Sequence, residues 1–108
     1  MEEKIYKKTV NNITMRAIHS FGELNADGGM FPMWLITVKD FGKVEITGNS
    51  IKVTKYNVEE DMSIDINLPK YNINKYVVED DETTAEMVFE IVYGLITMVY
   101  NFTYTALR

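Results

Sequence analysis

The side chains best suited to chemistry in this 108-residue sequence are two runs of adjacent carboxylates, Glu59–Asp61 and Glu79–Glu82. General acid–base catalysis needs a carboxyl group with a raised pKa, which usually requires partial burial. Runs of adjacent acids on turns are instead solvated. Carboxylates also bind Ca²⁺ and Mg²⁺, but neither run has the alternating acids, central glycine and closing glutamate of a calcium loop. We therefore interpret both runs as charged surface and predict no metal site and no cofactor.

His19 is the only histidine, and the chain contains no cysteine. A zinc site needs three or four nitrogen or sulfur ligands, so none is predicted. A hydrolytic arrangement of His19 with Ser20, Asp27 or Ser50 stays open, because catalytic triads assemble in space. No nucleophile-elbow motif supports it, and Gly28-Gly29 lacks the lysine of a phosphate loop. The sequence therefore predicts no catalytic residue and favours a non-enzymatic protein.

The composition limits the class of partner. The net charge is −5 and the pI is about 4.8, whereas direct nucleic-acid binding needs clustered lysines and arginines. An acidic surface is complementary to a partner protein with a basic surface, and complementary fields accelerate and orient association. We predict a partner-binding surface made of acids: Glu59, Glu60, Asp61, Asp65, Glu79, Asp80, Asp81 and Glu82.

The first 79 residues have the alternation and turn signals of short strands. The longest irregular stretch is Phe21–Pro32. Turns are predicted at Asn11-Asn12, at Asp40-Phe41-Gly42 (which matches a kinase motif only in its letters) and at Gly48-Asn49. The predicted strands are Ile5–Val10, Ile13–Ile18, Met33–Lys39, Val44–Thr47, Ile51–Tyr56, Met62–Leu68 and Tyr71–Val78. Strands followed by a helix indicate an α+β fold, with a mostly antiparallel sheet of about six strands and one long C-terminal helix packed on it.

The helix is predicted at about residues 82–106, with Thr83 and Glu86 as a capping box. Its apolar side covers more than half of its circumference, whereas a surface helix usually has an apolar stripe of about 100°. One sheet face covers only part of that width, so a second surface is expected. Tyrosine anchors interfaces because it buries a large area and keeps a polar tip. We therefore predict a homodimer interface formed by Tyr93, Thr97, Tyr100 and Tyr104. A membrane anchor is the alternative, but Glu90, Asn101 and the preceding acids disfavour it.

The whole chain, residues 1–108, is predicted to be a single domain. Its first residues are charged and lack the apolar region of a signal peptide, which favours the cytoplasm. An acidic composition rich in Asn, Lys, Ile and Tyr is typical of small phage or mobile-element proteins. These features lead to the hypothesis of an anti-defence inhibitor that blocks a nucleic-acid-binding enzyme by charge mimicry. The alternatives are a structural homo-oligomer, a toxin-immunity-type inhibitor, a membrane-anchored protein and a small hydrolase that uses His19.

Overall fold

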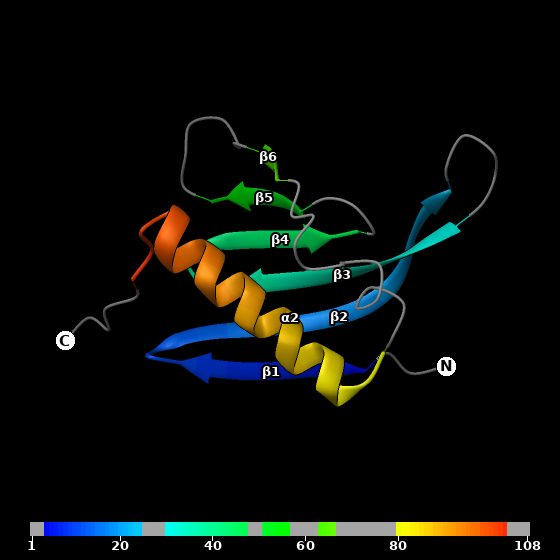
Figure 1. Cartoon of the computed structure of the whole chain (residues 1–108), viewed down its shortest axis with the longest axis horizontal. Coiled ribbons are helices and arrows are strands. Elements are labelled where there is room, and N and C mark those ends of the chain that lie inside the picture. The colour runs from blue at the N-terminus through cyan, green and yellow to red at the C-terminus, as the bar shows by residue number, and fades with distance from the viewer. Residues whose placement is uncertain (1–3, 25–29, 48–50, 57–62, 67–79, 104–108) are drawn as a thin grey trace.

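The computed structural model describes residues 4–24, 30–47, 51–56, 63–66 and 80–103 (Figure 1). Each strand in these ranges pairs antiparallel with the next, so that the sheet has the order β1-β2-β3-β4-β5-β6. This arrangement confirms the α+β fold with an antiparallel sheet followed by a helix. The elements are β1 (Ile5–Val10), β2 (Ile13–Leu24), β3 (Met30–Val38), β4 (Gly42–Ile46), β5 (Ile51–Lys55), β6 (Ser63–Ile66), the α-helix α2 (Glu82–Gly94) and its π-helical continuation η2 (Leu95–Val99).

Two of the predicted turns are confirmed. Asn11 and Asn12 both have positive φ, 49° and 70°, as a two-residue hairpin turn between right-twisted strands requires. Asp40 and Gly42 also have positive φ, 65° and 153°, at the turn between β3 and β4. The predicted strand Tyr71–Val78 lies outside the described residues, and so does the predicted turn at Gly48-Asn49. The strands on either side of that turn, β4 and β5, pair with each other.

The prediction of a long irregular stretch at Phe21–Pro32 was wrong at both of its ends, which are strand, whereas residues 25–29 lie outside the described residues. β2 continues to Leu24 and β3 begins at Met30, so both strands run past the ends of their neighbours (Figure 1). The pairing of β2 with β3 shifts register between Phe21 and Leu24. A bulge of this kind breaks the two-residue alternation by which strands are recognised in a sequence.

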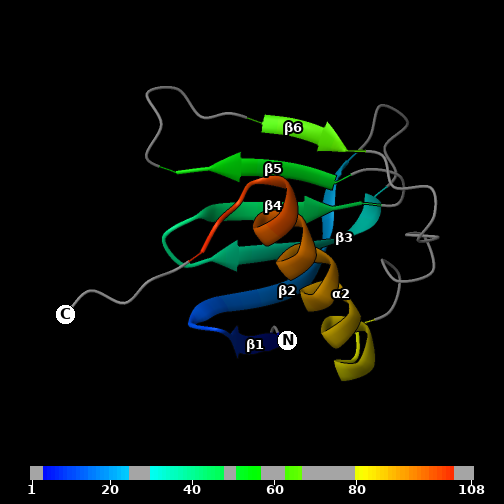
Figure 2. The same ribbon diagram turned by 60° about the vertical axis from the view of Figure 1, so that its left-hand side comes forward.

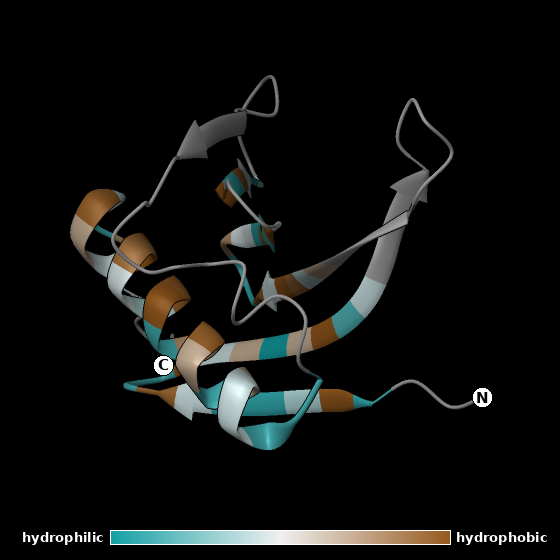
Figure 3. Cartoon of the chain, turned by 45° about the vertical axis from the view of Figure 1, so that its right-hand side comes forward, coloured by the Kyte–Doolittle hydropathy of each residue, from teal (hydrophilic) through white to brown (hydrophobic). Residues whose placement is uncertain are grey.

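α2 crosses one face of the sheet diagonally, from β1 at its first turns towards β4 at its last (Figures 1 and 2). The hydropathy rises along the same path, from a polar first turn to apolar later turns (Figure 3). Alternate residues of the strands supply one side of the core, and the helix supplies the other. The buried core residues are Ile13, Met15, Ala17, Trp34, Ile36, Val38, Phe41, Val44, Ile46, Ile51, Val53, Ala85, Val88, Phe89, Val92, Leu95 and Ile96.

The helix begins at Glu82, as predicted, but its capping residue and its C-terminal end differ from the prediction. The N-cap is Asp81, whose Oδ1 accepts the Thr84 N–H at 2.8 Å, and not Thr83. The helix ends at Val99 instead of continuing to about residue 106. Asn101 adopts a left-handed φ of 56°, and the Phe102 N–H turns back to the Ile96 carbonyl at 2.8 Å. Asparagine tolerates this conformation and ends helices as glycine does, which a hydrophobicity pattern does not reveal.

Candidate functional site: the groove between β1 and the helix

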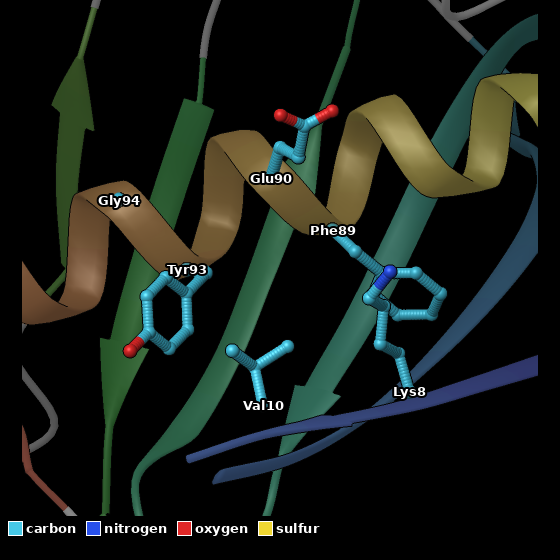
Figure 4. A pocket seen from close by; sticks show the side chains of 6 residues that line it. All are labelled: Lys8, Val10, Phe89, Glu90, Tyr93 and Gly94. Atoms are coloured by element: carbon cyan, nitrogen blue, oxygen red, sulfur yellow. The ribbon is translucent and has the colours of Figure 1, made fainter.

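An open groove lies between β1 and α2, where the diagonal helix moves away from the edge of the sheet. Its pocket has a volume of about 410 Å³. Val10 and Lys8 project into it from β1, and Phe89 and Tyr93 project towards the sheet from the helix, while the Glu90 carboxylate points away from the sheet (Figure 4). The pocket is lined by Lys8, Val10, Phe89, Glu90, Tyr93 and Gly94. It therefore combines an apolar floor with a cation and an anion at its rim.

Polar contacts tie the β1–β2 hairpin to the helix on both sides of this pocket. Lys8 forms an ion pair with Glu86. Beyond the pocket, the Asn11 amide donates a hydrogen bond to the Tyr93 hydroxyl at 2.7 Å. The first turn of the helix is held as well, because the Tyr6 hydroxyl donates to Asp80 Oδ1 at 3.0 Å. These three contacts link the two walls of the groove to each other.

Three of the acids predicted to bind a partner lie at the start of the helix. Asp80 accepts the Tyr6 hydroxyl, and burial together with this acidic neighbour raises the Tyr6 pKa. Asp81 caps the helix, and its hydrogen bonds from Thr84 lower its pKa. Glu82 is exposed in the first turn. Two of these acids therefore have structural roles in addition to any role in binding.

Of the other predicted acids, the structure describes only Asp65, which lies in a different element from this cluster. Asp65 lies in β6 and pairs across the strands with Lys52. The remaining four lie outside the described residues: Glu59, Glu60, Asp61 and Glu79. The structure adds two acids that the prediction omitted, Glu86 and Glu90, which are exposed and follow Glu82 at four-residue spacing. That spacing was visible in the sequence as the signal of a shared helix side.

The residues predicted to contact a second subunit lie mostly against their own sheet. Tyr93 and Tyr100 are half-buried and pack against the core. Thr97 donates its hydroxyl to the Tyr93 carbonyl at 2.6 Å. Tyr104 lies outside the described residues. The apolar side chains that this part of the helix exposes are Met98, at 79%, and Val99, at 60%. The homodimer stays a prediction.

A second aromatic cluster lies under the end of the helix. The Tyr100 and Phe102 rings meet the buried Phe41 ring edge-on, with centroids 5.8 Å and 5.0 Å away. Lys55 Nζ lies 6.0 Å from the centroids of the Phe41 and Tyr100 rings. The Tyr100 hydroxyl is buried without a hydrogen-bond partner, and burial raises the pKa of Tyr100. No sequence spacing indicated this cluster, because a turn and a helix end far apart in the chain form it.

The residues considered for hydrolysis show no catalytic geometry within the described ranges. The half-buried His19 ring packs edge-on against Trp34, with the ring centroids 5.1 Å apart. Ser20 is its neighbour in β2, while Asp27 and Ser50 lie outside the described residues. Among the residues described, no group of three or more His, Cys, Asp or Glu side chains is placed to hold a metal ion.

No helix in the described part of the chain is long and apolar enough to cross a membrane. The chain matches no model of a protein family, no curated protein and no solved structure.

Proposed function

We propose that this protein is a non-enzymatic binding protein that docks an acidic helix surface onto a basic surface of another protein. The observation that supports the proposal is the acidic ridge, defined as Glu82, Glu86 and Glu90, whose members are all exposed and of which Glu86 also pairs with Lys8. At about 1.5 Å rise per residue, the ridge places three carboxylates along about 12 Å. Duplex DNA carries one phosphate per about 3.4 Å of axis on each strand. The ridge therefore has a charge spacing of the same order as nucleic acid.

The ridge is held in place before any partner arrives. The residues between its carboxylates, Val88 and Phe89, are buried in the core, and Asp81 fixes the start of the helix. A preorganised surface loses less conformational entropy on binding than a mobile one. The specific form of the proposal is an inhibitor that occupies the basic channel of a nucleic-acid-binding enzyme, as an anti-defence protein of a phage or mobile element would.

The test compares two triple charge reversals that change the net charge equally. One replaces Glu82, Glu86 and Glu90 by lysine, and the other replaces Glu59, Glu60 and Asp61 by lysine. Tagged wild-type protein is used to capture partners from cell lysate, the captured proteins are identified by mass spectrometry, and duplex DNA is added as a competitor. We expect a basic nucleic-acid-binding enzyme that DNA displaces and that the ridge variant fails to capture.

Because Glu59, Glu60 and Asp61 are themselves predicted to bind the partner, the second reversal shows whether these acids or the net charge contribute to the capture as much as the ridge does. If it weakens capture as much as the ridge reversal does, the ridge is not the specific contact. Capture that survives the ridge reversal, in a variant with an unchanged melting temperature, contradicts the proposal. Captured proteins without a basic surface contradict the mimicry of nucleic acid.

A homodimer is the second candidate, and the exposure of Met98 and Val99 in the last helical turn favours it. Burying these two side chains against a second copy would remove apolar surface from water. Light scattering over a range of protein concentrations tests this, with Met98→Glu and Val99→Glu combined in one variant. A dimer that the double variant converts to a monomer supports the candidate, and a wild-type monomer at all concentrations excludes it.

A further inference from the structure

The face of the sheet opposite to α2, which we call the far face, carries a line of cations. Residues that pair across neighbouring strands project to the same face of a sheet. Lys7 pairs with Arg16, and Arg16 pairs with Thr37. Thr37 pairs in turn with Lys43. These pairs form one continuous line across β1, β2, β3 and β4, and we define its three cations, Lys7, Arg16 and Lys43, as the basic row.

The basic row projects away from the helix. Along β2 and β4 its residues alternate with core residues such as Ala17 and Val44, which are buried on the side that α2 covers. Figure 2 shows the helix lying on that side of the sheet. Lys7 and Arg16 are exposed, and Lys43 is half-buried. The row therefore lies at the surface, on the side of the molecule opposite to the acidic ridge.

The acids near the basic row lie in a different line of pairs. Glu45 projects from the far face as well and lies directly opposite Lys52 of β5. Asp65 of β6 is in register with the same lysine. Both acids therefore belong to the neighbouring row, which is centred on Lys52, and no acid interrupts the line of pairs from Lys7 to Lys43.

The basic row and the acidic ridge match in length. Neighbouring strands lie about 4.8 Å apart, so the two ends of the row, three strands apart, are separated by about 14 Å. The outer two carboxylates of the ridge are about 12 Å apart along the helix. The central one, Glu86, pairs with Lys8, but 49% of its side chain stays exposed. The Glu90 carboxylate points away from its own sheet (Figure 4). The ridge is therefore presented outward at the spacing of the row.

Each of the two charged lines has an apolar border. On the sheet, Ile5, Ile18 and Leu35 pair with one another in the line next to the basic row, and Ile5 is 46% exposed. On the helix, the half-buried Met87 and Ile91 border the ridge. Surface ion pairs contribute little free energy alone, so burial of these apolar borders would supply affinity while the charges supply orientation.

We propose that the protein assembles head to tail, with the acidic ridge of one copy docked on the basic row of the next. The two surfaces lie on opposite sides of the molecule, so each copy binds one neighbour through its helix and another through its sheet. A contact between two different surfaces does not stop at two copies but continues into a ring or a chain. The inference does not rest on the proposed function. Because it uses the same ridge, a second copy and a basic partner compete for that surface.

Three charge-reversed variants test the contact. The ridge variant has lysine at all three positions of the ridge, the row variant has glutamate at all three positions of the basic row, and the swap variant carries all six changes. The swap variant keeps the net charge of −5. Light scattering at increasing concentration measures the mean mass. We expect wild type and the swap variant to grow beyond a dimer, because opposite charges still meet, and the ridge and row variants to stay monomeric.

An equimolar mixture of the ridge and row variants provides the sharpest result. Each variant repels its own copies, but the lysines of one ridge meet the glutamates of the other row, so the mixture should associate. A wild-type protein that stays monomeric, or whose mass stops at two copies, overturns the head-to-tail assembly. A mixture that stays monomeric while wild type associates, with unchanged melting temperatures, overturns the assignment of the contact to these charges.

Lys43→Glu and Lys52→Glu form a matched pair of single variants. Each reverses one lysine on the far face, but only Lys43 belongs to the basic row, whereas Lys52 lies opposite Glu45. We expect Lys43→Glu to raise the dissociation constant of the assembly at least about fivefold and Lys52→Glu to raise it less than about twofold. Equal effects would show that net charge alone controls association, and the proposed contact would fall.

Dilution of wild type followed by NMR keeps the test valid if the reversed variants do not fold. The amide shifts of Arg16 and Thr37 on the sheet should change with concentration together with those of Glu86 and Glu90 on the helix. Raising the salt concentration from 0.1 M to 1 M should reverse these changes, because the screening length falls from about 10 Å to about 3 Å. Shifts confined to one of the two surfaces contradict a head-to-tail contact.

Capture of a basic enzyme separates this assembly from the proposed function. The row variant cannot assemble, so its ridge is fully available, and it should capture at least as much enzyme as wild type. If capture depends on the ridge while wild type is monomeric at every concentration, the proposed function stands and the assembly falls. If wild type assembles and the mixture of variants restores association, but no basic enzyme is captured, the assembly stands and the proposed function falls.

Discussion

Asp81 connects the stability of the fold with the start of the acidic surface. Its carboxylate accepts the Thr84 N–H and satisfies one of the donors that the first turn of a helix leaves free. The same hydrogen bonds stabilise the charged form and hold the pKa of Asp81 below its ordinary value of 3.8. Loss of this residue would therefore affect folding, and a binding experiment that changes Asp81 cannot separate the two roles.

The first prediction concerns the pH dependence of this cap. Because the folded pKa is lowered, the charged carboxylate stabilises the fold above the ordinary value of 3.8, and this stabilisation is lost as the pH falls through the lowered value. Asp81→Asn keeps an acceptor oxygen but no charge. We expect it to lower the melting temperature by a few degrees at neutral pH, with the difference from wild type shrinking below pH 3.8. Thermal unfolding followed by circular dichroism measures both, and a constant difference contradicts the assignment.

Tyr100 gives the second prediction. Its hydroxyl is buried without a partner, so Tyr100→Phe should raise the free energy of unfolding by about 1 kcal/mol at neutral pH. Burial raises the pKa of Tyr100, so the stabilisation from its neutral form is complete below the ordinary value of 10.0 and is lost as the pH rises above it. The variant should lose stability less steeply above pH 10.0 in urea unfolding. Destabilisation at neutral pH would show that the hydroxyl has a partner.

At the scale of elements, two glycines with opposite surroundings give the third prediction. A Cβ on Gly42 would lie 2.0 Å from the Thr54 carbonyl oxygen, and its φ is 153°. Gly42→Ala should therefore lower the free energy of unfolding by about 2 kcal/mol or more. A Cβ on Gly94 meets no atom within 4 Å, so Gly94→Ala should raise the free energy by about 1 kcal/mol through helix propensity. Urea unfolding of both variants checks the opposite signs.

The parts of the fold that the sequence revealed are those with a local signal. Asn11-Asn12 marked a tight turn, and Trp34, Ile36 and Val38 alternated along one face of a strand that is buried in the core. The ends of β2, β3 and the helix were mispredicted because their signals are not local. The bulge near Phe21 hides an alternation, and Asn101 ends an apolar run only because Phe102 has Phe41 to pack against.

Only part of the candidate site could be predicted from the sequence, because the rest depends on contacts between distant segments. Glu82, Glu86 and Glu90 share a helix side through local spacing alone. The pairing of Val10 with Phe89 across the groove depends on which strand lies under the helix, and no local pattern contains that information. The tyrosines were assigned to a second subunit from their spacing along the helix. That spacing does not reveal that Tyr93 and Tyr100 pack against the core of their own chain.

At the scale of the whole molecule, charge is distributed unequally between the two faces of the sheet. The ridge lies on the helix side, whereas Lys7 and Arg16 pair across β1 and β2 on the opposite face. Lys43 and Lys52 lie on that same face of β4 and β5 together with Glu45, and Lys8 and Lys55 lie on the helix side, so the asymmetry is partial. Such an asymmetric field orients an approaching charged partner, and salt screens it over about 10 Å at 0.1 M. This arrangement favours approach of a basic partner from the helix side.

The fourth prediction uses the sheet as a whole. Amide hydrogen exchange should be slowest in β2, β3, β4 and β5, each of which has a paired strand on both sides. In β1 the exchange rates should alternate. We expect Ile5, Lys7 and Thr9 to exchange fast and Tyr6, Lys8 and Val10 to exchange slowly, because only the latter set bonds to β2. Residue-resolved exchange by NMR tests this, and uniform protection along β1 would show that its edge is already covered.

The diagonal helix also determines when the protein can fold during its synthesis. All six strands precede α2 in the chain, and the core is closed only by residues up to Ile96. At about 5–20 residues per second, the ribosome releases the apolar face of the sheet several seconds before the segment that covers it. Until then the nascent chain exposes Trp34, Ile36 and their neighbours. Translation that stops before Ile96 would therefore leave a fragment whose apolar sheet face is uncovered, and we expect such a fragment to aggregate.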